Sequence, residues 1–118
     1  MAYFDKIYLK GKILIIGKKI AYNFEWDHEK AKTNKKKHKI SFENSATIFK
    51  DPRAITIYDS DHSGKEERWI TLGLSSNGIL LVVNHTYKQI DNKTAIIRII
   101  SSRKATKHEQ AQYKEELN

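Results

Sequence analysis

Apolar and polar residues alternate in several short runs along this chain of 118 residues, and that period of two is typical of half-buried strands. Aromatic and polar residues alternate from Tyr22 to Trp26, which predicts one such strand. Four further runs predict strands, at residues 54–58, 69–74, 79–85 and 95–102. The Ser-Ser-Asn-Gly sequence between the second and third of these predicts a tight hairpin. The last run is apolar on both faces, so we expect it at the centre of the sheet.

Three helices are predicted by capping residues and local pattern, over residues 28–38, from residue 42 to about 50, and from 106 to 117. Asp27 and Ser41 are the N-caps of the first two, and Pro52 ends the second because proline removes a backbone donor. Thr106 and Glu109 have the spacing of a capping box for the third. The order β-α-α-β-β-β-β-α predicts an α+β fold, in which a mostly antiparallel sheet carries the helices on one face.

The first 21 residues stand outside this order. Their apolar runs, with Gly11 and Gly17 as turn residues, predict either an extra hairpin or an appendage to the main domain. We therefore divide the chain into an N-terminal extension of uncertain structure (residues 1–21) and a single domain (residues 22–118).

Composition narrows the protein class. The chain has no cysteine, which excludes a disulfide framework and a thiolate metal site. Its longest apolar run, Ile13 to Ile16, is far too short to span a bilayer and is not followed by a small-residue cleavage site. We expect a soluble cytoplasmic protein without a membrane partner.

Positive charge is concentrated in the first half of the chain. Residues 1–50 hold 12 lysines against five acids, whereas residues 51–118 hold ten cations against nine acids, within a net charge of +8. Six lysines and no acid occur between Lys30 and Lys39. Such a field favours polyanions such as RNA. A solvated helix face, or a surface for an acidic protein partner, would give the same pattern.

The segment from Asp59 to Gly73 carries the most suggestive chemistry. A polar loop containing His62 leads through Glu66 to Arg68, where an apolar strand begins. Histidine, carboxylate and arginine are the side chains that metal-free phosphodiester cleavage requires. The alternative is that His62 is only a turn residue and that the charges only solvate the edge of the sheet.

Arg98 is unusual because it lies inside the predicted central strand. It must be paired or face a cleft, since an unpaired buried charge is very costly. Arg103 follows at the end of the same strand, and Arg68 enters a neighbouring one on the face of Glu66. These three arginines and one carboxylate would form a phosphate clamp with a base beside it. A structural ion pair between Arg98 and Glu66 is the competing interpretation.

Other sites are disfavoured. No two histidines have the spacing of a zinc motif, and the chain lacks a Walker A loop, a dinucleotide-binding glycine motif and a nucleophile elbow. We therefore expect no metal and no cofactor. His38, at the end of the first helix, is either a hydrogen-bonded core residue or a proton donor.

Three segments, at residues 24–52, 61–73 and 97–113, together resemble the BrnT-type toxins of bacterial type II toxin–antitoxin systems. Their motifs occur in that family's order and spacing over roughly Tyr22 to Tyr113. The resemblance implies a RelE-like fold and a ribonuclease activity that arrests translation. It also implies neutralisation by a cognate BrnA-type ribbon-helix-helix antitoxin, through which alone the toxin would contact DNA.

The resemblance can be followed residue by residue. The family's Lys-His-Gly-x-Ser-Phe motif falls on residues 37–42, with Lys39 in place of a glycine that suits a left-handed helix end. The Glu-Glu-Arg-Trp motif is intact at residues 66–69. The Arg-Ile-Ile-Ser-Ala-Arg motif falls on residues 98–103 with Ser102 in place of alanine. The next position, often arginine, is Lys104, which keeps the charge but loses bidentate phosphate binding.

The leading hypothesis is a metal-independent endoribonuclease that acts on mRNA. Either Glu66 or His62 would take the proton of a 2′-hydroxyl, and the arginines would stabilise the phosphate. Four lysines would hold the RNA backbone without reading its sequence: Lys32, Lys35, Lys36 and Lys104. A non-catalytic module that binds RNA or the antitoxin, as a degenerate toxin would, is the alternative. A purely structural partner-binding domain is a third hypothesis.

Overall fold

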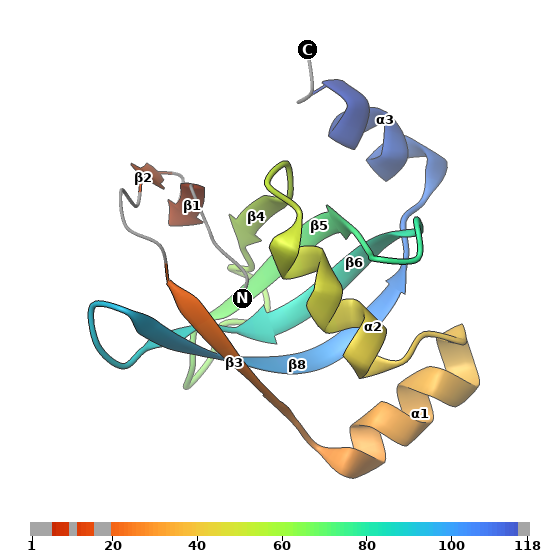
Figure 1. The fold of residues 1–118 in the computed structure, drawn as a ribbon, viewed down its shortest axis with the longest axis horizontal. Coiled ribbons are helices and arrows are strands. Elements are labelled where there is room, and N and C mark those ends of the chain that lie inside the picture. The colour runs from red at the N-terminus through yellow and green to blue at the C-terminus, as the bar shows by residue number, and fades with distance from the viewer. Residues whose placement is uncertain (1–5, 10–11, 16–19, 116–118) are drawn as a thin grey trace.

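The computed structural model describes residues 6–9, 12–15 and 20–115. Its main feature is a six-stranded sheet in which five strands follow the order β3-β8-β6-β5-β4 (Figure 1). A short sixth strand, β7, pairs with β8 beside this path. The bounds are β3 Ala21–Trp26, β4 Ile55–Tyr58, β5 Arg68–Leu74, β6 Leu80–Thr86, β7 Lys88–Gln89 and β8 Thr94–Lys104.

The strand positions follow the predicted pattern closely, and the α+β fold with a mostly antiparallel sheet is confirmed. The apolar strand β8 lies between β3 and β6, as its two apolar faces predicted. β3 pairs with β8 in parallel, whereas the other pairs are antiparallel. β7 lies in a segment that the sequence predicted as a loop.

The helices are α1 (His28–His38), α2 (Phe42–Ala46), its 3₁₀ continuation η1 (Thr47–Lys50) and α3 (Lys107–Glu115). The Asp27 side chain accepts a hydrogen bond from the backbone of Glu29, and the Ser41 hydroxyl accepts one from Asn44, so both predicted caps form. α1 ends in the left-handed geometry that favours glycine at a helix end. Lys39 adopts it with φ 61° and donates its backbone N–H to Lys35.

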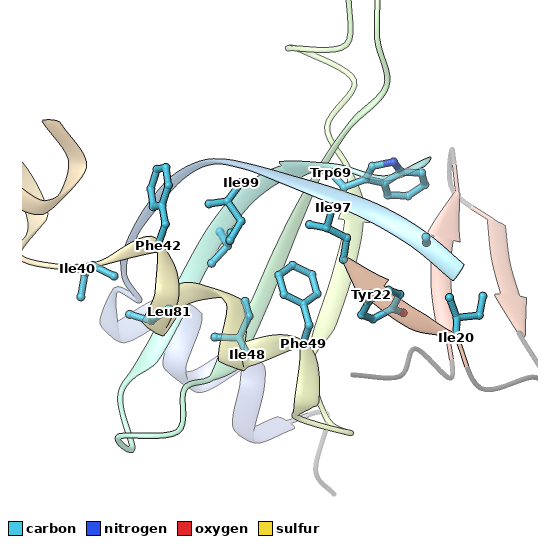
Figure 2. Packing of buried hydrophobic residues seen from close by; sticks show 12 residues of the cluster. Ile20, Tyr22, Ile40, Phe42, Ile48, Phe49, Trp69, Leu81, Ile97 and Ile99 are labelled. Carbon is cyan, nitrogen blue, oxygen red and sulfur yellow. The ribbon is translucent and has the colours of Figure 1, made fainter. Parts of the chain in front are cut away.

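The main hydrophobic core fills the space between one sheet face and the segment α2–η1 (Figure 2). Phe42 of α2 and Phe49 of η1 pack against Ile97 and Ile99 of β8, with Trp69 of β5 on the same sheet face. Burial of these large side chains supplies most of the driving force for this packing.

Gly73 of β5 permits the close approach of η1 to the sheet. A Cβ at this position would lie only 3.0 Å from the Cβ of Ile48 and 3.2 Å from the Cβ of Ala54. A larger residue would therefore push η1 away from the strand.

α3 lies on the other face of the sheet, so the expectation that all helices share one face is wrong for this helix. Tyr113 packs with Leu72, Val82 and Ala105, a cluster separate from the main core. The hydroxyl of Tyr113 donates to the carboxylate of Asp51 at 2.6 Å, which ties α3 to the end of η1. The physical reason is that α2 and η1 already fill the first face, whereas the second carries an apolar stripe that needs cover.

Two short strands near the N-terminus pair with each other. β1 (Lys6–Leu9) and β2 (Lys12–Ile15) pair antiparallel in a separate two-stranded sheet, which agrees with the first of the two expectations. Gly11 and Gly17, the predicted turn residues, lie outside the described residues. Ile20 is buried in the main core, so the packed domain begins slightly before residue 22.

Candidate active site

A row of side chains crosses the second sheet face, the one opposite the main core. Trp69 and Ile99 are buried in the main core, so their chain neighbours Arg68 and Arg98 project from the second face. Thr86 of β6 lies between them. It is the register partner of Arg68, and its hydroxyl accepts a hydrogen bond from the backbone N–H of Arg98 at 3.3 Å. The two arginines therefore share one face of the sheet, as the hypothesis of a phosphate clamp requires.

Glu66 connects the two arginines. Its Oε1 atom forms an ion pair with Nη2 of Arg98 and lies 3.6 Å from Nη2 of Arg68. Two guanidinium groups thus converge on one carboxylate oxygen. Because phosphate oxygens carry the same charge and accept the same hydrogen bonds, this geometry suits a phosphodiester as well as a carboxylate.

Exposure distinguishes a cleft from a buried ion pair. The side chains of Arg68, Arg98 and Glu66 are 34%, 39% and 44% exposed. Ion pairs this accessible to solvent contribute little to stability. The ion pair between Arg98 and Glu66, which was the competing interpretation, does form, but it is exposed, so the cluster is also open to a ligand.

The polar partner of His62 is Asp59 rather than a member of this ion-pair cluster. Its Nδ1 atom lies 2.9 and 3.1 Å from the two carboxylate oxygens of Asp59, in the same loop between β4 and β5. Sequence reasoning named His62 but missed Asp59. The feature that could have identified Asp59 is its position three residues before His62 in a polar loop, because a turn can bring two such side chains into contact.

Arg103 has a different partner from the one expected. Its guanidinium donates two hydrogen bonds to Glu109 of α3, at 2.7 and 2.9 Å. The hydrogen bonds from Arg103 lower the pKa of Glu109 to about 2. Glu109 also accepts from the backbone of Thr106, which completes the predicted capping box. Arg103 thus shares the second face but is bound at the start of α3, away from Glu66.

The remaining predicted residues lie along α1 and at the end of β8. His38 is half-buried and lines a shallow groove of about 310 Å³ between α1 and β8, together with Lys37 and Ser101. The four lysines proposed to bind RNA are exposed: Lys32, Lys35, Lys36 and Lys104. Their positions suit contacts with a polyanion outside the arginine cluster.

A buried histidine, His85, belongs to the fold rather than to the site. Its Nδ1–H donates to the carbonyl of Thr86 at 2.9 Å, and its Nε2 accepts from the hydroxyl of Thr71 at 2.6 Å. The hydroxyls of Thr71 and Thr56 lie 2.8 Å apart, which extends this buried chain of hydrogen bonds. Burial lowers the pKa of His85 to about 4, so its ring is neutral at neutral pH.

A groove of about 260 Å³ lies on the second face beside α3. Ile57 and Ile70 line it with three other aliphatic residues, and Glu109 and Glu115 form part of its wall. Ile57 is 48% exposed, which is unusual for a large aliphatic side chain on a sheet. The second face therefore combines a cationic cluster with an apolar surface.

The described part of the chain holds neither a metal-binding cluster nor a membrane-spanning helix. No group of three or more histidine, cysteine, aspartate or glutamate side chains within residues 6–9, 12–15 and 20–115 has the geometry to hold a metal ion. In the same ranges, no helix has the length and apolar character needed to cross a membrane.

Comparison with known proteins identifies the family of the chain. A family model described as the ribonuclease toxin BrnT of type II toxin–antitoxin systems matches residues 26–109, which include both arginines and the loop between β4 and β5. No curated protein matches the chain.

A solved structure is also similar. The 1.1 Å crystal structure of the Brucella abortus ribonuclease toxin BrnT aligns with a TM-score of 0.52 and 19% sequence identity. The alignment covers 74% of this chain and 100% of that one. At this level of identity the likeness establishes the shared fold.

Proposed function

The chain belongs to the BrnT family of ribonuclease toxins of type II toxin–antitoxin systems, and we propose that it is a metal-independent endoribonuclease that cleaves mRNA in the cytoplasm and thereby arrests translation. The observation that carries the proposal is the pair of half-exposed arginines, Arg68 and Arg98, around one oxygen of Glu66. A phosphate of the RNA would take the place of that carboxylate oxygen, because it offers the same charge and the same acceptors.

In the proposed reaction the 2′-hydroxyl of a ribose attacks the adjacent phosphorus. Glu66 or His62 takes the proton of that hydroxyl as the bond from the 2′-oxygen to phosphorus forms. The bond from phosphorus to the 5′-oxygen breaks, and the leaving oxygen takes up a proton, with His38 as a candidate source. The products are a 2′,3′-cyclic phosphate and a 5′-hydroxyl. Arg68 and Arg98 stabilise the extra negative charge of the transition state.

The basic residues outside the cluster would hold the rest of the substrate. Arg103 is 43% exposed on the same sheet face, and Lys104 follows it, so both are proposed to contact an adjoining phosphate. The lysines of α1 would bind the RNA backbone further along, without selecting a sequence.

We expect the purified chain to cleave single-stranded RNA in the presence of EDTA, and its expression without an antitoxin to stop bacterial growth. Gel analysis of RNA fragments, and growth curves after induction, are the measurements. The double variant Arg68→Ala/Arg98→Ala is the control, since it removes the proposed phosphate site. RNA binding without cleavage would favour the alternative, a non-catalytic module that binds RNA or the antitoxin.

We also propose that the natural partner is a BrnA-type ribbon-helix-helix antitoxin that covers the second sheet face. The support is the continuity between the arginine cluster and the apolar groove on that face. The aliphatic side chains of an antitoxin segment would fill the groove. Its acidic side chains would pair with Arg68 and Arg98, neutralise part of the +8 charge and block access of RNA. DNA would then be contacted only through the antitoxin.

This partner proposal predicts a salt-dependent complex. We expect the affinity for the antitoxin to fall roughly tenfold between low and high salt, because salt screens charge contacts but leaves the apolar contacts in place. Calorimetric titration at several salt concentrations measures it. An affinity that stays constant over this range would place the basic residues outside the interface. A charged substitution at Ile57 should weaken binding at every salt concentration.

A further inference from the structure

We propose that Asp59 is a positioning residue that fixes the tautomer of His62, and that Nε2 of His62 is the atom that accepts the proton of the 2′-hydroxyl. This inference rests on the proposed ribonuclease activity and deepens it. It selects His62 over Glu66 and gives a role to Asp59, which neither the sequence motifs nor the arginine cluster explained.

Asp59 continues the pairing of β4 with β5 beyond the end of β4. The last register pair between β4 and β5 is Tyr58 with Trp69, and the backbone N–H of Asp59 then donates to the carbonyl of Arg68 at 2.9 Å. Asp59 thus continues the ladder as the neighbour of Arg68. Tyr58 packs against the main core, so the next side chain projects from the second face. Asp59 therefore extends the row formed by Arg68, Thr86 and Arg98.

Ser63 makes hydrogen bonds within the loop that carries His62. The hydroxyl of Ser63 donates to the carbonyl of Asp59 at 2.6 Å and accepts from the backbone N–H of Arg68 at 3.0 Å. These contacts close the base of the loop. Asp59, His62 and Arg68 are consequently held in one hydrogen-bonded unit, next to the proposed phosphate site.

The contact with Asp59 determines which ring nitrogen of His62 carries the hydrogen. Asp59 is buried, with a relative exposure of 9%, and both of its carboxylate oxygens face Nδ1 of His62. A shielded carboxylate requires a donor, so Nδ1 carries a hydrogen. The His62 side chain is 69% exposed, which leaves Nε2 open to solvent and to substrate. A histidine base whose ring is oriented by a hydrogen-bonded carboxylate is a recurring catalytic arrangement.

Glu66 is less suited to the same task. Its Oε1 atom faces both Arg68 and Arg98, in the position where the substrate phosphate would bind. It must leave that position before the phosphate enters. His62 keeps its orientation whether or not a phosphate is bound, because its partner Asp59 lies outside the arginine pair.

The kinetic test uses four single variants, Glu66→Gln among them, and one double variant. We expect Asp59→Asn and His62→Gln each to slow single-turnover cleavage of a short RNA about 100-fold in EDTA, with RNA affinity nearly unchanged. Asp61→Asn, which removes the same charge from an exposed position in the same loop, should cleave at the wild-type rate. The double variant Asp59→Asn/His62→Gln should be no slower than His62→Gln alone, because Asp59 acts through His62.

A spectroscopic measurement separates positioning from a general effect on folding. At pH 8, nitrogen-15 spectra of the imidazole should show His62 with its hydrogen on Nδ1 in the wild type. In Asp59→Asn this preference should be lost, while thermal melting shows that the protein remains folded. The signature requires neither RNA nor activity.

The possible outcomes are distinguishable. If the wild type cleaves RNA and the Asp59→Asn and His62→Gln variants cleave it at the wild-type rate, this inference is overturned and the proposed function stays intact. A loss confined to Glu66→Gln would assign the base to Glu66 and overturn it as well. A wild type that binds RNA but never cleaves it would overturn the proposed function itself.

Discussion

Arg98→Ala and Arg68→Ala are expected to abolish detectable toxicity while leaving a folded protein. In the proposed reaction each guanidinium stabilises charge that develops on the phosphate, and removal of one such group typically costs about 10²–10³-fold in rate. Both side chains are more than a third exposed, so the loss of stability should be at most about 1 kcal/mol. A buried ion pair would instead cost roughly 3–5 kcal/mol when broken.

The measurements are single-turnover RNA cleavage, growth after induction, and thermal melting of the purified variants. Arg53→Ala is the matched control, because Arg53 is exposed in the turn before β4 and should be dispensable for both activity and stability. Folded Arg68→Ala and Arg98→Ala variants with full activity would remove the basis of the site assignment. Poorly folded variants would instead support a structural role for Arg98.

The second large effect concerns stability in acid. In the unfolded chain His85 takes up a proton below about pH 6.5, whereas burial holds its pKa at about 4 in the folded protein. Between these values the unfolded state binds more protons, so stability falls as the pH falls. The free energy of unfolding is therefore unaffected by His85 above pH 6.5 and is lowered by about 3 kcal/mol by the time the pH reaches 4.

Urea unfolding between pH 4 and pH 7.5 measures this loss. A ring-proton titration of His85 provides a direct check, since its signal should stay that of a neutral imidazole until the pH approaches 4. A free energy of unfolding that is flat from pH 6.5 to pH 4 would show that His85 is not shielded as the structure describes.

Several parts of the fold were predictable because they depend on neighbouring residues. α1 begins after Asp27 and ends at His38 as predicted, since capping and helix termination are local interactions. The capping box of Thr106 and Glu109 forms for the same reason. The alternation of side chains along the chain also predicted that Arg68 shares one face with Glu66, because the two are separated by an even spacing.

Other features depend on which elements meet. The parallel pairing of β3 with β8 joins segments that are far apart in the sequence. α3 packs on the second face because that apolar stripe remained uncovered, a circumstance that the pattern of α3 itself does not reveal. Arg103 consequently binds Glu109 rather than Glu66. These contacts arise from packing between distant segments.

The sequence by itself determined the α+β class, the bounds of most helices and strands, and the side-chain types of the candidate site, because each follows from local hydrogen bonding, alternation and chemical character. Only the tertiary structure decided how those side chains are used. The strand register brought Asp59, Arg68 and Arg98 into one row, and the closure of the loop set His62 against Asp59. Register and loop closure decided these contacts, because they fix the distances between residues that are not neighbours in the chain.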